Sequence, residues 1–160
     1  MTHPGQLLRE KNLYAGKEKG QNFLANPGIA KMIIEKIGLS NDTRVLEIGP
    51  GLGALTIPIA RAALHVTAVE TDARLIPLLQ QELDNENLKN VTIIHKNILK
   101  IDIADLSCDK KFVVIGNLPY NISSQILIKL VEERRCIETA FLMFQKELAT
   151  RIIAKPGGRD

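Results

Sequence analysis

Short apolar runs alternate with longer amphipathic segments along most of this 160-residue chain. The apolar runs are rich in β-branched residues, which is typical of buried strands. We predict strands at 44–49, 65–70, 91–96, 112–116 and 139–144. Such near-continuous apolar runs are the pattern of a parallel sheet whose two faces are both covered by helices.

The intervening segments carry leucine and isoleucine at helical spacing. In the first of them, Ile29, Ile33 and Ile37 form one apolar stripe between Pro27, which suits a first helical turn with Asn26 as its cap, and Gly38, which suits an end. Asp72 is a candidate N-cap for a later helix, and Ser123 or Ser124 for another. We predict helices at 27–37, 53–64, 71–84, from Ser123 or Ser124 onward, and at 146–153.

The domain organisation follows from these boundaries. Residues 1–20 are polar and basic and are expected to form a flexible arm, whereas 21–160 form one α/β domain. Only five strands precede the turn-like end of the chain, and a sheet of this kind usually has more. We therefore expect an incomplete domain that lacks its last strands.

Composition excludes several classes of protein. A net charge of +3 permits contact with phosphates but does not require it. No apolar stretch reaches the roughly 20 residues of a membrane span, and the N-terminus lacks a signal-peptide core. Cys108 and Cys136 have no CxxC spacing, which favours reduced thiols in the cytoplasm. The three histidines form no metal-ligand pattern, so we predict no metal.

A glycine-rich stretch follows the first predicted strand. Gly49, Gly51 and Gly53 leave room for a ligand to approach the backbone, and Glu70 ends the next strand. An acid at that position in an open α/β sheet can accept hydrogen bonds from both ribose hydroxyls of an adenosine cofactor. A tight turn with a solvated Glu70 is the structural alternative.

The same stretch does not choose the cofactor. Gly49, Gly51 and Ala54 formally meet the dinucleotide fingerprint, which leaves an NAD-dependent oxidoreductase as an alternative. Pro50 and the extra Gly53 depart from that pattern. Hydride transfer also gives no reason for the polar sequence after the fourth strand.

That sequence is NLPY. Asn117 offers a neutral acceptor, Pro119 fixes the turn while leaving the Leu118 carbonyl available, and Tyr120 offers a face on which a base can stack. Two acceptors that hold both hydrogens of an exocyclic amine would draw its lone pair out of ring conjugation and make it a better nucleophile. A rigid β-turn in which Asn117 caps the strand is the alternative.

Five motifs together resemble the KsgA family of S-adenosylmethionine-dependent rRNA adenine N(6),N(6)-dimethyltransferases, and the related Erm enzymes of 23S rRNA share most of them. The resemblance runs from about residue 16 to the end. The motifs are GQNFL (20–24), LEIGPGLGALT (46–56), Glu70, NLPYNISS (117–124) and FQKELATRI (144–152).

This resemblance implies a Rossmann-like class I methyltransferase fold with S-adenosylmethionine as methyl donor. It implies a target of two adjacent adenosines in 16S rRNA within the assembling small subunit, and a helical second domain beyond this chain. We further expect a cytoplasmic monomer. An Erm-type enzyme and a non-catalytic ribosome-assembly module are the remaining alternatives.

Site residues follow from the resemblance motif by motif. For the target amine and base they are Asn117, Leu118, Pro119 and Tyr120. For the cofactor they are Gln21, Asn22, Leu24, Gly49, Gly51, Glu70, Asn97 and Asn117. Asn97 replaces the family's usual acid, which predicts weaker but not abolished cofactor binding. It could instead be a turn residue, and GQNFL could simply dock the arm.

Basic residues near the end of the chain are candidates for RNA phosphate contacts. We assign this role to Lys146, Arg151 and Lys155. A solvated helix face is the structural alternative for each of them.

Overall fold

Five parallel strands form one sheet in the computed structural model, which describes residues 27–106, 110–118, 121–144 and 146–153. The strand order is β3-β2-β1-β4-β5, and all four neighbouring pairs are parallel. The strands are β1 (Arg44–Ile48), β2 (His65–Glu70), β3 (Val91–His95), β4 (Phe112–Asn117) and β5 (Ile137–Met143). All five predicted strands are confirmed, with ends that differ by up to two residues.

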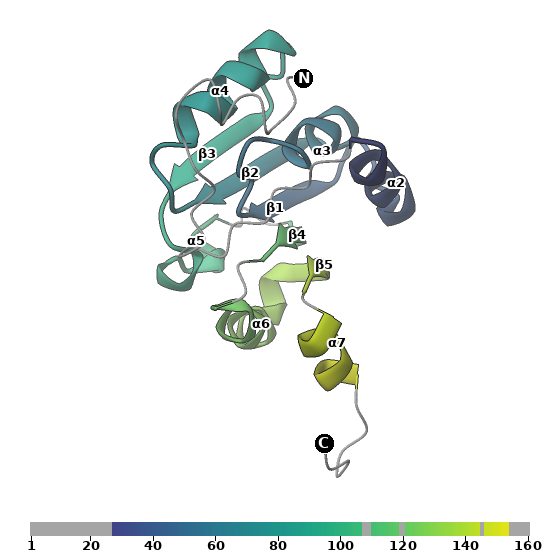
Figure 1. Ribbon diagram of the computed structural model, residues 1–160, viewed down its shortest axis with the longest axis vertical. Coiled ribbons are helices and arrows are strands. Elements are labelled where there is room, and N and C mark those ends of the chain that lie inside the picture. The colour runs from purple at the N-terminus through teal and green to yellow at the C-terminus, as the bar shows by residue number, and fades with distance from the viewer. Residues whose placement is uncertain (1–26, 107–109, 119–120, 145, 154–160) are drawn as a thin grey trace.

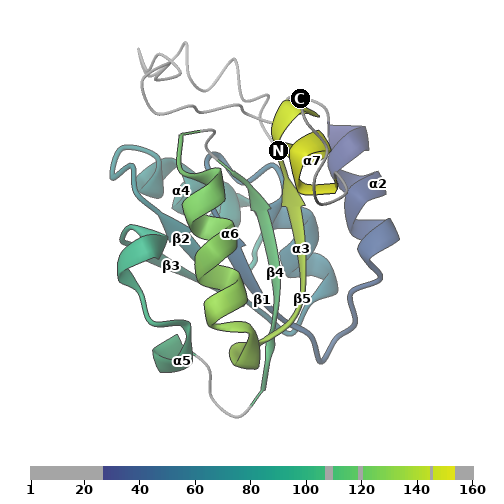
Figure 2. The ribbon, with the colours of Figure 1, turned by 90° about the horizontal axis from the view of Figure 1, so that it is seen from below.

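Helices connect the strands and cover both faces of the sheet. They are α2 (Pro27–Ile37), α3 (Thr56–Ala62), α4 (Ile76–Asn85), α5 (Ile103–Leu106), α6 (Ser123–Glu132) and α7 (Lys146–Ile153), with short 3-10 turns η2 (Ile98–Lys100) and η3 (Arg134–Cys136). Figure 1 shows α2, α3 and α4 on one side of the sheet and α5 and α6 on the other. Figure 2 shows the same layers from below, with α6 lying in front of the sheet.

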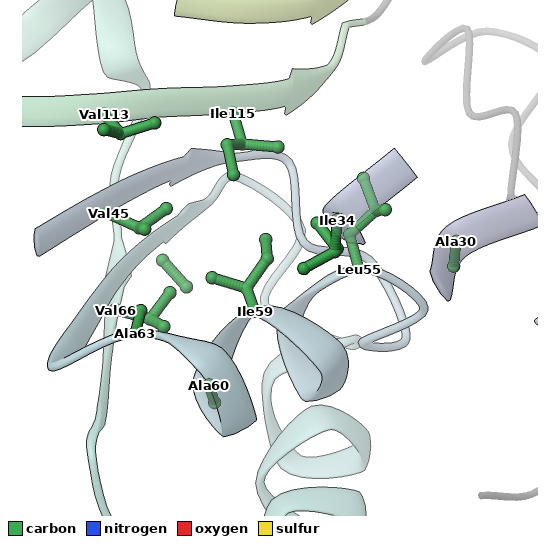
Figure 3. Close-up of a cluster of buried hydrophobic side chains, with 11 residues drawn as sticks. Ala30, Ile34, Val45, Leu55, Ile59, Ala60, Ala63, Val66, Val113 and Ile115 are labelled. Atoms are coloured by element: carbon green, nitrogen blue, oxygen red, sulfur yellow. The ribbon is translucent and has the colours of Figure 1, made fainter. Parts of the chain in front are cut away.

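The alternation of side chains along β1 supplies both halves of the core. Val45 faces α2 and α3, where it packs with Ile34 and Ile59 (Figure 3). Leu46 faces the opposite layer, where it packs with Ile126 of α6. Because both faces are covered, the central strands read as mainly apolar runs.

Three details of the predicted helices are wrong. Asp72 does not cap α4: its carboxylate accepts from the Arg74 N–H at 3.1 Å in a turn, and the helix starts four residues later. Neither candidate serine caps α6, since Ile122 is its N-cap and Ser123 is buried inside the first turn. Helix α3 also starts three residues later than predicted, because a turn occupies 51–55.

The predicted apolar stripe of α2 is shifted around the helix. Ala30 and Ile34 are buried, whereas Ile29 is 41% exposed and Ile33 and Ile37 lie at the edge of the core. By contrast, Leu75, Leu79 and Leu83 of the α4 region, which lie at helical spacing, are all buried. In the described part of the chain, no helix combines the length and apolar character needed to cross a membrane.

The strand order creates a switch point between β1 and β4. The chain adds β2 and β3 on one side of β1 and then returns to add β4 and β5 on the other. Connections leaving β1 and β4 therefore diverge to opposite faces of the sheet, and ligands of open α/β sheets bind where this happens, beyond the carboxyl ends of the strands.

Candidate functional site

The glycine loop and the NLPY segment meet at this switch point. Ile48 pairs with Gly116 in the sheet, so the residues that follow them leave neighbouring strands side by side. A Cβ atom added to Gly49 would lie 3.6 Å from the Asn117 carbonyl oxygen. The sequence stretches that suggested a cofactor and a target amine thus lie next to each other in the structure.

All three loop glycines adopt positive φ angles. The values are +72° for Gly49, +58° for Gly51 and +87° for Gly53, a region that residues with a Cβ rarely adopt. Gly53 has a second constraint, because an added Cβ would lie 2.8 Å from Cδ1 of Leu79. The loop therefore needs glycine for its own conformation, as expected for a tight turn. The absence of side chains at these positions also leaves the edge of the sheet open.

Glu70 is anchored by backbone donors from two sides. Its Oε1 accepts from the N–H groups of Thr71 and Asp72 at 2.8 Å each, and its Oε2 accepts from Gly51 at 3.1 Å. The residue is only 5% exposed, so the alternative of a solvated acid is wrong. Three of the roughly four acceptor positions of a carboxylate are occupied. In this arrangement Glu70 can accept one further hydrogen bond at Oε2, and a second would require Gly51 to release its own.

Asn117 and Leu118 end β4 at the same edge. Asn117 is partly buried and Leu118 is almost completely buried. The Leu118 N–H donates to the Met143 carbonyl at 3.3 Å, which ties this segment to β5. Gly116 leaves room for its neighbours, because a Cβ there would lie 2.8 Å from Cδ2 of Leu118 and 3.2 Å from the Ile48 carbonyl oxygen.

Asn97 has the local role that the alternative interpretation gave it. Its Oδ1 accepts from the Leu99 N–H at 3.0 Å and caps the 3-10 turn η2. The side chain is partly exposed. Since an amide oxygen has two acceptor positions, one position is left for a ligand, and the predicted cofactor role of Asn97 stays a prediction.

Several assigned residues lie outside the described part of the chain. These are Gln21, Asn22, Leu24, Pro119, Tyr120 and Lys155. Among the basic candidates that are described, Lys146 and Arg151 are exposed on α7.

Two buried polar residues were missed at the sequence level. Glu47 is 1% exposed near the carboxyl end of β1, and Thr56 at the start of α3 is fully buried. Neither Oε2 of Glu47 nor Oγ1 of Thr56 has a hydrogen-bond partner in the described structure. Burial raises the pKa of Glu47 to about 8, the nearby Thr56 hydroxyl lowers it somewhat, and the Glu70 carboxylate raises it again. The sequence signal that could have revealed Glu47 is a charged residue inside the apolar run of the first strand.

The histidines have ordinary contacts. The Nε2 atom of His65 lies 3.0 Å from the Thr92 hydroxyl, and that of His95 lies 3.3 Å from the Thr71 carbonyl. Within the described residues, no three His, Cys, Asp or Glu side chains gather in a way that could hold a metal ion.

Comparison with known proteins places this geometry in a family. The family model of ribosomal RNA adenine dimethylases matches residues 14–160. The chain is 57% identical over 160 residues to ribosomal RNA small subunit methyltransferase A of Desulforapulum autotrophicum, an alignment that covers 100% of this chain and 56% of that protein. The chain thus spans about half the length of the curated relatives it matches.

Two solved structures share both fold and sequence. A dimethyladenosine transferase from Plasmodium falciparum has a TM-score of 0.73 and 34% identity, over 86% of this chain and 48% of that one. The 23S rRNA methyltransferase ErmE has a TM-score of 0.71 and 33% identity, over 81% of this chain and 50% of that one. The fold is therefore the Rossmann-like methyltransferase fold predicted from the sequence, and the chain belongs to the ribosomal RNA adenine dimethylase family.

Proposed function

We propose that this chain is the cofactor-binding and catalytic part of an rRNA adenine N(6),N(6)-dimethyltransferase. It would transfer methyl groups from S-adenosylmethionine to the exocyclic amines of two adjacent adenosines in 16S rRNA. The observation that carries the proposal is the close approach of the loop at Gly49 to the Asn117 backbone at the switch point of the sheet. Donor and acceptor of a methyl group must meet at one place, and these two segments do.

The residues present fit an adenosine cofactor. A loop without side chains at Gly49 and Gly51 lies beside Glu70, whose Oε2 has one acceptor position left for a ribose hydroxyl. Asn97, on the far side of β2 in the turn after β3, would accept from the adenine amine. Gln21, Asn22 and Leu24 would complete the methionine end.

The chemistry asked of the protein is mainly positioning. When bound, S-adenosylmethionine supplies a methyl group on a positively charged sulfur. Asn117 and the Leu118 carbonyl would hold the target amine in line with that group, Pro119 would fix the turn, and Tyr120 would stack on the target base. A neutral acceptor suits this task, because an anion in direct contact with the reacting groups would stabilise the sulfonium charge that must disappear during transfer.

The RNA partner would extend beyond the reacting base. Lys146, Arg151 and Lys155 would contact phosphates, and the exposure of the first two on α7 is compatible with this role. We propose that residues 21–160 are the catalytic domain, that 1–20 form a basic arm, and that the protein acts as a cytoplasmic monomer on the assembling small subunit. No metal is needed in this scheme.

The small-subunit target is favoured over the 23S target by the comparisons. The relative that is 57% identical is named for the small subunit, whereas the 23S enzyme ErmE is 33% identical. The NLPYNISS and QKE motifs also resemble the KsgA branch more closely.

Methyl incorporation tests the proposal. Intact protein would be incubated with radiolabelled S-adenosylmethionine and with small or large ribosomal subunits that lack the respective modification. We expect label in N(6),N(6)-dimethyladenosine of 16S rRNA and none in 23S rRNA. Label in 23S rRNA alone would identify the Erm-type alternative, and binding to subunits without any label would identify the assembly module.

A further inference from the structure

Glu47 is a buried carboxylic acid, and one of its two side-chain oxygens has no hydrogen-bond partner in the described structure. It lies in β1 between Leu46 and Ile48, pairs in register with Ala68 and Ile115, and is 1% exposed. Its Oε2 has no hydrogen-bond partner in the described structure. An ionised carboxylate in such surroundings is strongly disfavoured, whereas a neutral acid is tolerated.

The position of Glu47 connects it to the candidate site. It precedes Gly49 by two residues, which is about 7 Å along an extended strand. The Glu70 carboxylate, which reaches Gly51 of the same loop, already acts on the pKa of Glu47 through space. A charge bound beyond the end of β1 would therefore act on Glu47 in the same manner, with the sign reversed if the charge is positive.

We propose that Glu47 is a proton-linked cation sensor, neutral while the carboxyl edge of the sheet is empty and ionised when a cationic cofactor binds there. This inference rests on the proposed use of S-adenosylmethionine and adds a proton to its binding equilibrium. The cofactor contact itself needs no direct bond to Glu47, because the attraction acts across the loop.

The size of the effect is sufficient for a switch. At an effective dielectric constant of about 20, a unit positive charge bound at about 7 Å from the Glu47 carboxyl group would lower its pKa by a little under two units. From the value of about 8 in the empty state, the pKa of Glu47 would fall below neutrality. Binding at pH 7 would then release roughly 0.7 of a proton.

Charged side chains of the elements packed around Glu47 form ion pairs elsewhere, with Glu70 as the exception. Within α2, Lys31 pairs with Glu35 at 3.7 Å and both are exposed. In α3, the exposed Arg61 pairs with the partly buried Glu86 that follows α4. Strand β4 has no titratable side chain between its ends, and Glu70 of β2 is the neighbouring charge that raises the pKa of Glu47.

Two positive charges of the cofactor could lower the pKa of Glu47, and three related ligands distinguish between them. S-adenosylmethionine has a sulfonium and an ammonium, S-adenosylhomocysteine has only the ammonium, and methylthioadenosine has neither. Proton release would be measured by calorimetry in buffers of different ionisation enthalpy at pH 7. Release with the first ligand alone assigns the sulfonium, and release with the first two assigns the ammonium.

Glu47→Gln is the matching variant, because its side chain copies the shape of the neutral acid. We expect the proton release to disappear and the affinity for S-adenosylmethionine to lose its rise of about twentyfold between pH 6 and pH 8. Glu35→Gln removes the same charge from an exposed position and should retain both the proton release and the pH dependence of the affinity. Any contribution from the amino group of the ligand itself should be the same in the two variants.

A direct reading on the unmodified protein avoids any effect of the substitution on folding. The carbon-13 signal of the Glu47 carboxyl should titrate near pH 8 without ligand and at least one unit lower with S-adenosylmethionine. Binding with no proton release and an unmoved titration would overturn the inference while leaving the proposed function intact. Failure of the ligand to bind at all would instead contradict the proposed function.

Discussion

The backbone N–H of Gly51 donates a hydrogen bond of 3.1 Å to Oε2 of Glu70 and so ties the glycine loop of β1 to the end of β2. Two further N–H groups hold the other oxygen of the same carboxylate. Glu70 thus has a structural role in the loop as well as its proposed role toward ribose, and the two roles predict different consequences of substitution.

Glu70→Gln should affect both roles. The amide retains one acceptor but turns its NH₂ group toward either Gly51 or the pair of Thr71 and Asp72, whichever oxygen it replaces. We expect a loss of about 1–3 kcal/mol in the free energy of unfolding and at least a tenfold loss in affinity for S-adenosylmethionine. Urea unfolding and calorimetry measure the two quantities. Glu86→Gln, at an exposed pair with Arg61, should leave the affinity unchanged.

Gly53→Ala tests how far the loop conformation depends on packing. Gly53 and Gly38 both have positive φ, but an added Cβ meets Cδ1 of Leu79 at 2.8 Å in the first case and nothing within 4 Å in the second. Both substitutions should destabilise the chain by about 1 kcal/mol through backbone strain, and Gly53→Ala by about 1–2 kcal/mol more through overpacking. Equal losses in urea unfolding would show that Leu79 relaxes without cost.

Glu47→Gln should change how stability depends on pH. The pKa of Glu47 is raised to about 8 from an ordinary value of 4.5, so the folded chain binds a proton that the unfolded chain has released between these values. The free energy of unfolding of the unmodified chain should therefore fall as pH rises from about 5 to 8. The variant should lack this contribution, which amounts to as much as about 4 kcal/mol at pH 8. Parallel pH profiles for the two proteins would show that Glu47 does not titrate in this window.

Asn117→Ala should separate binding from chemistry. Without the amide acceptor, the target amine loses one of the two groups that would orient it. We expect S-adenosylmethionine affinity to change less than threefold and methylation by the intact protein to fall by on the order of 10²-fold or more. Calorimetry and methyl incorporation are the two measurements. Unchanged turnover would remove Asn117 from the proposed site.

The strands and the glycine loop could be predicted from sequence because local pattern determines them. Strands buried on both faces read as apolar runs, and a loop that needs three positive φ angles reads as alternating glycines. Helix starts were less predictable, because Asp72 engages Arg74 in a turn instead of capping α4. The stripe of α2 was misplaced by one position because contact with α3 and the sheet, not periodicity alone, selects the buried face.

The electrostatics of the site depended on the fold. Nothing local to Glu70 indicates that Gly51, 19 residues earlier, donates to it. The raised pKa of Glu47 likewise comes from burial by α3 and from Glu70 on the neighbouring strand, which are contacts distant in sequence. Residues such as Asn97 that act within a few positions show their structural role in sequence, whereas residues that join two strands do not.

The most direct test of the central claim is a calorimetric titration of this chain with S-adenosylmethionine, with NAD in parallel, for the unmodified sequence and for Glu70→Gln. We expect one-site binding of S-adenosylmethionine, weakened at least tenfold by the substitution, and no heat from NAD. Binding of NAD in place of S-adenosylmethionine, or an S-adenosylmethionine affinity that Glu70→Gln leaves unchanged, would contradict the proposed function.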